Sequence, residues 1–76
     1  MNIVFETRTA DSASFFTTTV YQLTPSSFFL VIRYSSAVDP AYDFFLNGGQ
    51  MFDSLAKAKD AATMQITDFL SVEVAP

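Results

Sequence analysis

Side chains in the first half of the chain can be assigned to two alternating faces, with the period of two that is typical of β-strands. Three such segments are rich in the β-branched and aromatic residues that favour extended structure: residues 2–9, 14–23 and 27–35. Small polar residues separate the first two segments. Pro25 lies between the second and third, where its fixed φ suits a turn. The pattern therefore predicts three strands, of which the second and third form a hairpin.

The middle of the chain predicts a loop and a short fourth strand. Residues 36–41 form the loop, because Pro40 disfavours a helical conformation at the residue before it. The segment AYDFFL, residues 41–46, fits a strand with aromatic residues on alternate positions. The following NGG, residues 47–49, is a strong hairpin or loop signal, so we expect residues 50–52 to pair only briefly after it.

The last segment, DSLAKAKDAATMQITDFL (residues 53–70), has the period of a helix. Its apolar residues recur at spacings of three or four and form one stripe: Leu55, Ala58, Ala62, Ile66 and Phe69. Asp53 or Ser54 can accept hydrogen bonds from the free N–H groups of the first turn. The final SVEVAP, residues 71–76, predicts either a short edge strand or a frayed end. The order of elements predicts one α+β domain over residues 1–76, with a three- to four-stranded antiparallel sheet and one C-terminal helix packed on one face.

The two faces of this sheet are both apolar. The segment SSFFLVIRYSS (residues 26–36) contains five consecutive large apolar residues and does not alternate. We assign the stronger apolar set to the helix side: Ile3, Phe5, Phe28, Leu30, Ile32, Tyr34 and Phe44. The inward set of the second strand stays open between two alternatives: Phe15, Tyr21 and Leu23, or Phe16 and Val20. The uncovered face then holds Phe29, Val31 and Phe45, with Val4 and one aromatic residue of the second strand.

An uncovered apolar face needs an explanation. Burying each such side chain stabilises a protein by roughly 1.5–3 kcal/mol, and several exposed together favour aggregation. The composition sharpens the point, since 50% of the 76 residues are hydrophobic and only 16% are charged, against roughly 25% in a typical soluble domain. A chain this short has little interior for its nine Phe and three Tyr. We therefore expect a partner protein, a second copy or the C-terminal tail to cover this face.

Charge and residue usage exclude several kinds of chemistry. The net charge is −4 and the four bases, Arg8, Arg33, Lys57 and Lys59, form no cluster, which argues against direct nucleic-acid binding. An acidic protein can instead approach a basic protein surface. The chain has no Cys and no His, so it has no disulfide, no thiolate and no histidine general base. We expect no enzyme activity, no cofactor and no metal site.

The aspartates and glycines of the predicted loops are interpreted mainly as residues that form turns. Asp39 and Asp43 lie in one predicted loop, and we interpret them as turn-forming residues that could also contact a basic partner. Gly48 and Gly49 lack the spacing and the Lys-Ser/Thr of a phosphate-binding loop. No apolar segment reaches the ~20 residues that span a bilayer. The N-terminal MNIVFETR lacks the basic and apolar regions of a secretory signal, so a cytoplasmic location is expected.

The sequence FDSLAKAKDAA, residues 52–62, resembles the helix start of many small proteins of phages and mobile elements. The size, acidity and β-then-α order of the chain are similar to those of anti-CRISPR proteins, the phage-encoded inhibitors of CRISPR effector complexes. The same helix start also resembles small antitoxin domains of the HicB type, although the proline-rich segment that usually precedes their helix is missing. The anti-CRISPR resemblance implies inhibition by binding a nuclease or its nucleic-acid surface, without catalysis, and transfers no site residues.

The sequence thus predicts a non-enzymatic protein-binding module, a phage-encoded inhibitor of a host defence complex that acts by occlusion in the host cytoplasm. The predicted contact residues are Phe29, Val31 and Phe45 as anchors and Asp39 and Asp43 as a charged rim. The predicted partner is a protein, with a nucleic-acid-binding effector as the leading candidate, and no membrane is involved. The alternatives are a structural protein that assembles into homodimers or larger oligomers and an antitoxin-like regulatory domain.

Overall fold

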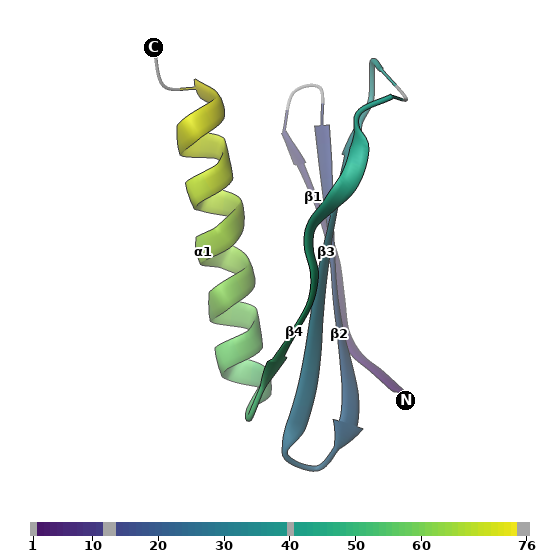
Figure 1. The fold of residues 1–76 in the computed structure, drawn as a ribbon, viewed down its shortest axis with the longest axis vertical. Coiled ribbons are helices and arrows are strands. Elements are labelled where there is room, and N and C mark those ends of the chain that lie inside the picture. Colours follow the sequence, from purple (N-terminus) through teal and green to yellow (C-terminus); the bar gives the residue numbers. More distant parts are fainter. Residues whose placement is uncertain (1, 12–13, 40, 75–76) are drawn as a thin grey trace.

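The structure is a computed structural model that describes residues 2–11, 14–39 and 41–74. It contains four strands followed by one helix: β1 (Asn2–Asp11), β2 (Ser14–Thr24), β3 (Ser27–Ser36), β4 (Asp43–Phe52) and α1 (Leu55–Val74). The strands form one sheet in the order β1-β2-β3-β4, and each neighbouring pair is antiparallel. The helix lies along one face of this sheet (Figure 1), so the predicted α+β architecture is confirmed.

The core lies between α1 and the two central strands. Its buried apolar residues are Phe16, Val20, Phe28, Leu30, Ile32, Ala58 and Ala62. The inward set of β2 is therefore Phe16 and Val20, which resolves the alternative that the sequence leaves open. The two alanines let the helix backbone lie close to the sheet, and the predicted stripe residues Leu55, Ile66 and Phe69 pack around them.

The predicted hairpin at residues 47–49 is wrong, because β4 continues through both glycines to Phe52. The pairing with β3 is irregular at two places: between Leu30 and Ile32, where the two glycines lie, and between Ile32 and Arg33, where Leu46 is the extra residue. Hydrogen bonds of one β4 side chain stabilise this path. The Asn47 side chain accepts a hydrogen bond from the Gly49 N–H at 2.9 Å and donates one to Gln65 Oε1 of α1 at 2.9 Å.

The predicted position of Ile3 on the helix side is also wrong. The pairing of β1 with β2 shifts between Ile3 and Phe5, where one extra residue enters β1. Phe5 lies opposite the buried Val20, whereas Ile3 lies opposite Tyr21. Directly opposed residues of an antiparallel pair point to the same face. Ile3 therefore joins Tyr21 on the face away from α1, and 55% of its surface is exposed.

The helix begins as predicted and ends later than predicted. The Ser54 hydroxyl accepts a hydrogen bond from the Lys57 N–H at 3.1 Å, which makes Ser54 the N-cap. The helix continues to Val74, so no edge strand forms over residues 71–74, and residues 75–76 lie outside the described residues. No Gly or Pro interrupts it before this point. No helix in the described ranges is long and apolar enough to cross a membrane.

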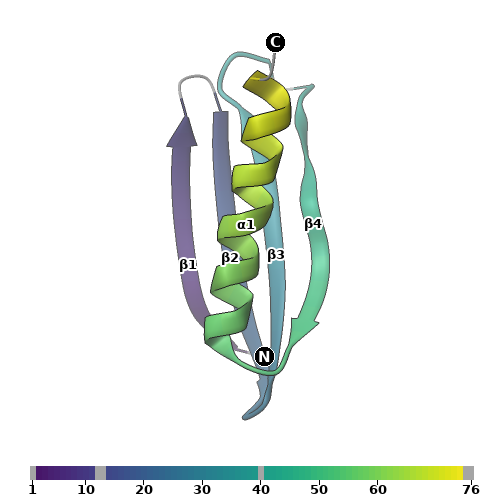
Figure 2. The same ribbon diagram turned by 90° about the vertical axis from the view of Figure 1, so that its left-hand side faces the viewer.

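The helix does not cover the whole sheet. Its backbone approaches β2, β3 and β4 but stays away from β1. Figure 2 shows α1 in front of the two central strands, with β1 to one side and nothing beside its outer edge. One face of the sheet and one strip of the other face thus remain uncovered by any helix or strand of the described chain.

Candidate protein-binding face

The face of the sheet opposite α1, here called the open face, carries a row of large side chains that crosses all four strands. The strand registers align them side by side: Ile3, Tyr21, Phe29 and Met51. We call this set the apolar row. Its outer members are half exposed, Ile3 at 55% and Met51 at 50%, and the two central members are half-buried. With strands about 4.8 Å apart, the row spans about 14 Å.

The Phe29 side chain of the apolar row reaches Gly49 of β4. Its ring covers the backbone of Gly49, so closely that a Cβ at position 49 would overlap the ring. Gly49 also has a φ of 146°, which L-residues with side chains rarely adopt. The neighbouring Val31 lies on the same face and is likewise half-buried. The structure therefore places two of the predicted anchors, Phe29 and Val31, in the floor of this face.

Polar and charged residues form the middle of the open face. The Thr19 hydroxyl donates a hydrogen bond to Glu6 Oε2 at 3.3 Å, and Thr19 is only 7% exposed although no helix covers it. The Arg8 guanidinium lies over the Phe15 ring, 4.1 Å from its centroid, in a cation–π contact. Glu6 and Arg8 of β1 thus each contact a side chain of β2.

Asp43 and Arg33 form a two-pronged ion pair on the same face. Arg33 Nε and Nη2 donate to Asp43 Oδ1 and Oδ2 at 2.8 and 2.7 Å. This hydrogen bonding, with the charge of the guanidinium, holds the pKa of the Asp43 carboxyl below its usual value and raises the pKa of Arg33. The predicted rim residue Asp43 therefore carries no free charge for a basic partner. Phe45, opposite Arg33 across the strands, is 61% exposed and is the most accessible of the predicted anchors.

The second predicted rim residue, Asp39, lies in the loop between β3 and β4. Its carboxylate accepts a hydrogen bond from the Ala41 N–H at 3.0 Å, and its own N–H donates to Ser36 Oγ at 3.1 Å. These contacts give Asp39 the structural role of a turn residue. The same loop exposes two apolar side chains that sequence reasoning did not assign to a site, Val38 at 78% and Tyr42 at 60%.

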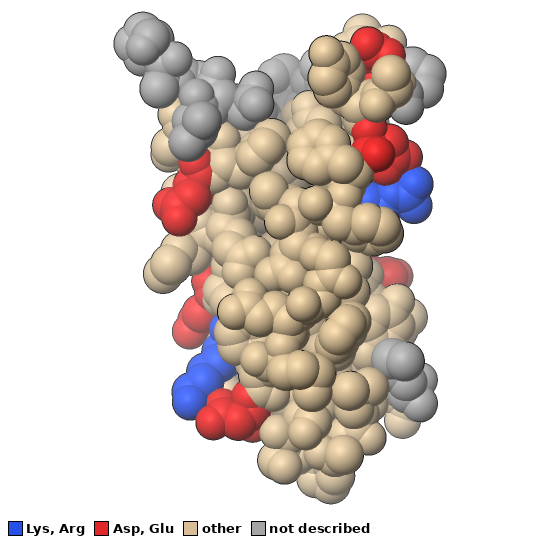
Figure 3. Space-filling view, viewed as in Figure 1, with Lys and Arg blue, Asp and Glu red and all other residues tan. Residues whose placement is uncertain are grey.

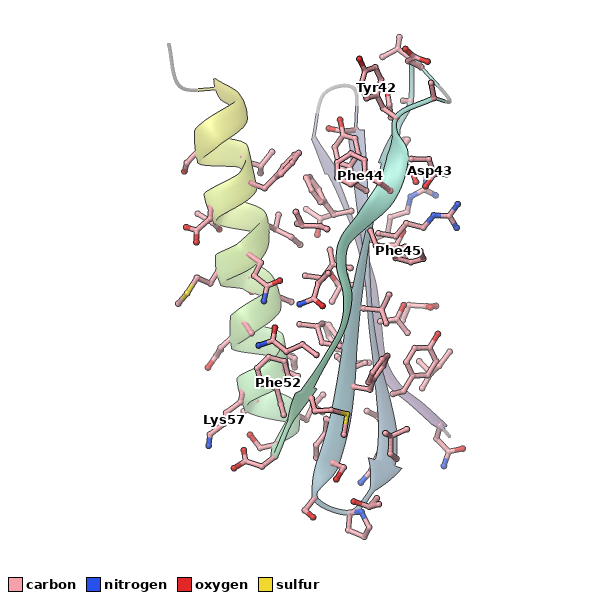
Figure 4. All side chains as sticks on the ribbon, viewed as in Figure 1. Tyr42, Asp43, Phe44, Phe45, Phe52 and Lys57 are labelled. Atoms are coloured by element: carbon pink, nitrogen blue, oxygen red, sulfur yellow. The ribbon has the colours of Figure 1, made fainter. Side chains whose placement is uncertain are left out.

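The aromatic doublet at the start of β4 divides between the two faces of the sheet. Figure 4 shows Phe44 on the side of α1, and Asp43 and Phe45 on the opposite side. The Phe44 ring stacks on Tyr34 with 4.9 Å between ring centroids, and it lies 6.2 Å from the Phe69 ring. Together with Tyr42, these rings line an open pocket of about 480 Å³ at this end of the molecule.

Charged residues lie at the margins of the view in Figure 3. This view looks along the sheet and not onto the open face. The charged residues lie on the outer side of α1, next to the β3–β4 loop and at the margin opposite α1, and the surface between them is uncharged. On the helix, Lys57 pairs with Asp53 at 3.0 Å, one turn away. The side of the molecule seen in this view, over β4 and towards α1, is therefore neutral with charged groups at its borders, a distribution that suits contact with protein rather than with phosphate groups.

A groove of about 310 Å³ runs between α1 and β1, on the strip that the helix does not cover. Apolar and threonine side chains line it, Phe5, Thr7, Thr18 and Ile66 among them, and Lys59 lies over the Phe5 ring at 4.6 Å. The lining contains no carboxylate and no imidazole, so the groove offers no acid–base pair. Within the described ranges, moreover, no three Asp or Glu side chains come close enough together to hold a metal ion.

Comparison with known proteins adds no relative. No protein-family model, no curated protein and no solved structure matches this chain.

Proposed function

We propose that this protein is a protein-binding module and that its open face is the contact surface. The observation that carries the proposal is the apolar row, four large side chains that cross the whole sheet on a face without any covering helix or strand in the described chain. Exposed apolar surface of this extent marks interaction sites in soluble proteins. Aromatic residues and Met are enriched in such interfaces.

The charge distribution favours a protein partner over a nucleic acid. The net charge is −4, and the two arginines of the open face are already engaged, Arg8 by the Phe15 ring and Arg33 by Asp43. Nucleic-acid affinity depends on several free cations that displace counterions from phosphates. Both arginines of the open face already contact other side chains, so neither is a free cation for a phosphate. The acidic molecule as a whole would instead be attracted to a basic partner surface.

The specific function that we propose is inhibition of a host defence complex of the CRISPR type by occlusion, in the cytoplasm of the host of a phage. Two properties support it: the small size and acidity of the chain, and the exposed apolar row on its open face. Inhibition by occlusion needs only shape and charge complementarity, and a small sheet face with one well-packed helix behind it can provide both.

The decisive experiment compares two methionines that are about equally exposed. Met51 lies in the apolar row and is 50% exposed, whereas Met64 is on the helix and 65% exposed. Met51→Asp should weaken binding to a purified CRISPR effector complex at least about tenfold, and Met64→Asp should not. The same pair of variants should differ in the same direction when inhibition of CRISPR interference is measured in cells.

The general and the specific proposals fail in different ways. If the effector complex is not bound but another purified protein binds in a manner that depends on Met51 and not on Met64, the protein-binding role stands and the defence target is wrong. If Met51→Asp and Met64→Asp bind every identified partner equally well, the open face is not the contact surface.

Self-association through the open face is a second candidate, because the apolar row could cover a copy of itself. Sedimentation of the unmodified chain and of the Met51→Asp variant across a concentration series separates the two. A dimer that dissociates in the variant supports self-association through this face. If the chain is a monomer at every concentration, self-association is excluded and the apolar row is assigned to contact with a different protein.

A further inference from the structure

The two edges of the sheet differ in regularity. The β4 edge is broken by two register irregularities and contains Gly49 in an unusual backbone conformation. β1 is a strand of ten residues, and its pairing with β2 is regular from Phe5 to Asp11. Soluble proteins protect long edge strands with prolines, bulges or a covering element, because a free edge can pair with another strand. β1 has one bulge, at Val4. Beyond it the strand has no proline and no covering element, and its charged side chains, Glu6 and Arg8 among them, discourage pairing only with a strand that does not complement them.

The surroundings of β1 leave room for another strand. The α1 backbone stays away from β1, and Figure 2 shows no element beyond its outer edge. The side chains from Glu6 to Ala10 are exposed on both faces of the strand. A second strand could therefore add to this edge without displacing the helix.

The sequence of β1 is complementary to itself in one register. Glu6 and Arg8 flank Thr7 and both point to the open face, because they lie opposite Thr19 and Thr17 of β2. In an antiparallel pair centred on Thr7, Glu6 of each copy lies opposite Arg8 of the other copy. Opposite charges across a strand pair are stabilising, and like charges are destabilising. A parallel alignment of two β1 strands in the same register would instead place like charges side by side.

We propose that two copies of this chain form a two-fold symmetric dimer by antiparallel pairing of their β1 strands, centred on Thr7. The two-fold axis is perpendicular to the sheet and joins both sheets into one, with the two helices on the same face. The interface is isologous, and both of its charged pairs are Glu6 with Arg8. The dimer leaves both apolar rows exposed on the open face, so it is independent of the proposed protein-binding function.

Cross-linking tests the register directly, because the chain contains no Cys. In the proposed dimer the two copies of residue 7 face each other with their Cα atoms about 4.5–5.5 Å apart, within the range that a disulfide spans. Thr7→Cys should therefore form a covalent dimer on mild oxidation. Thr9→Cys is the control: its two thiols are offset by four residues, about 13 Å, which is too far for a disulfide.

Charge reversal provides a second test that does not depend on a new thiol. Glu6→Arg alone and Arg8→Glu alone each place like charges opposite each other twice, and each should weaken the dimer by about tenfold or more. An equimolar mixture of these two single variants should restore dimerisation as a heterodimer. The double variant Glu6→Arg/Arg8→Glu should also recover self-association. Asp60→Arg and Lys57→Glu, which make the same charge changes on the helix, are the matched controls.

The cross-linking and charge-reversal experiments together support or overturn the proposed dimer. Selective cross-linking at position 7 together with restoration by mixing supports the proposal. A chain that stays monomeric across the concentration series overturns it, and so does a dimer that responds to Met51→Asp but not to charge reversal on β1. Because the mixing experiment compares variants with each other, a loss of monomer stability in one of them cannot mimic the restored heterodimer.

Discussion

The ring of Phe29 lies directly on the backbone of Gly49, on the open face of the sheet. The ring occupies the volume that a side chain at position 49 would need, and it shields the backbone of a residue that has no side chain of its own. An aromatic residue opposite a strand glycine compensates for the packing that glycine lacks. This contact explains why β4 can pass through two consecutive glycines and still pair with β3 beyond them.

Gly49→Ala should destabilise the fold by about 1–3 kcal/mol, because the methyl group would displace the Phe29 ring and because the φ of 146° is unfavourable for alanine. Gly48→Ala is the matched control, since a Cβ there meets nothing within 4 Å. It should change stability by no more than about 0.5 kcal/mol. Urea denaturation of both variants measures the difference, and equal stabilities would contradict the packing described here.

Two phenylalanines of different burial should respond differently to the same substitution. Phe16 is fully buried against the Tyr34 and Phe69 rings, and Phe45 is 61% exposed. Phe16→Ala should cost about 3–5 kcal/mol and could unfold a domain of this size. Phe45→Ala should stay within about 0.5 kcal/mol of the unmodified chain. Thermal denaturation followed by circular dichroism is sufficient, and a larger loss for Phe45→Ala than for Phe16→Ala would reverse the assignment of β-strand faces.

Adjacent threonines of β2 should respond to valine substitution with opposite signs. The Thr18 hydroxyl is buried and has no hydrogen-bond partner among the described residues, whereas the Thr19 hydroxyl donates to Glu6. Thr18→Val removes an unsatisfied polar group and should stabilise the fold by about 1 kcal/mol. Thr19→Val removes a hydrogen bond and should cost about 0.5–1.5 kcal/mol. The midpoints of urea denaturation report both changes, and destabilisation by Thr18→Val would indicate that this hydroxyl is hydrogen-bonded in solution.

The Arg33–Asp43 pair gives the fold a small stability term that depends on pH. Hydrogen bonds and the charge of Arg33 lower the pKa of Asp43 in the folded state. The term is therefore present above the pKa of Asp43 in the unfolded chain, about 3.9, and is lost as the pH falls through the folded-state value. Carboxyl titration by NMR should find the pKa of Asp43 below this reference. In an Arg33→Gln variant it should move up towards the reference, and an unchanged pKa would show that the ion pair does not persist in solution.

Local sequence patterns predicted the parts of the fold that depend on local chemistry. The apolar alternation of Phe28, Leu30 and Ile32 correctly assigns the buried face of β3, and Pro25 correctly marks the turn before it. The helix stripe and the Ser54 cap are confirmed for the same reason, since residues within one or two turns of each other decide both. The second strand was ambiguous because its two faces are almost equally apolar, and only packing against the helix distinguishes Phe16 from Phe15.

The two wrong predictions, the face of Ile3 and the hairpin at residues 47–49, both concern features that tertiary contacts decide. A single extra residue in a strand moves every following side chain to the other face. A regular period of two places Ile3 and Phe5 on one face, and only the pairing of Ile3 with Tyr21 reveals the shift between them. The two glycines of β4 have the sequence of a hairpin. The Asn47 side chain bonds to Gln65 of the helix, and β4 pairs with β3 again beyond the glycines, from Gln50 to Phe52. These contacts hold the glycines extended instead.

The candidate site was predictable only in outline. Phe29, Val31 and Phe45 do lie on the face away from the helix, and their role in binding stays a prediction. The Asp43 ion pair with Arg33 could not be read from the sequence, because the two residues are ten positions apart and meet only through the β3–β4 register. Met51 and Tyr21 were missed as members of the site because the row they form depends on how all four strands align.

The irregular β4 edge limits how far any assembly of this chain can grow. A sheet with two regular edges can add copies at both ends without limit and form fibrils. Here the irregularities around Asn47 and Gly49 make the β4 edge unsuitable for pairing. If β1 pairs with a second copy as proposed, the dimer therefore has no regular edge left for a third copy. The two glycines therefore oppose polymerisation of the chain through its sheet edges. Replacing them with residues of high strand propensity is expected to make the β4 edge regular enough to pair with another copy.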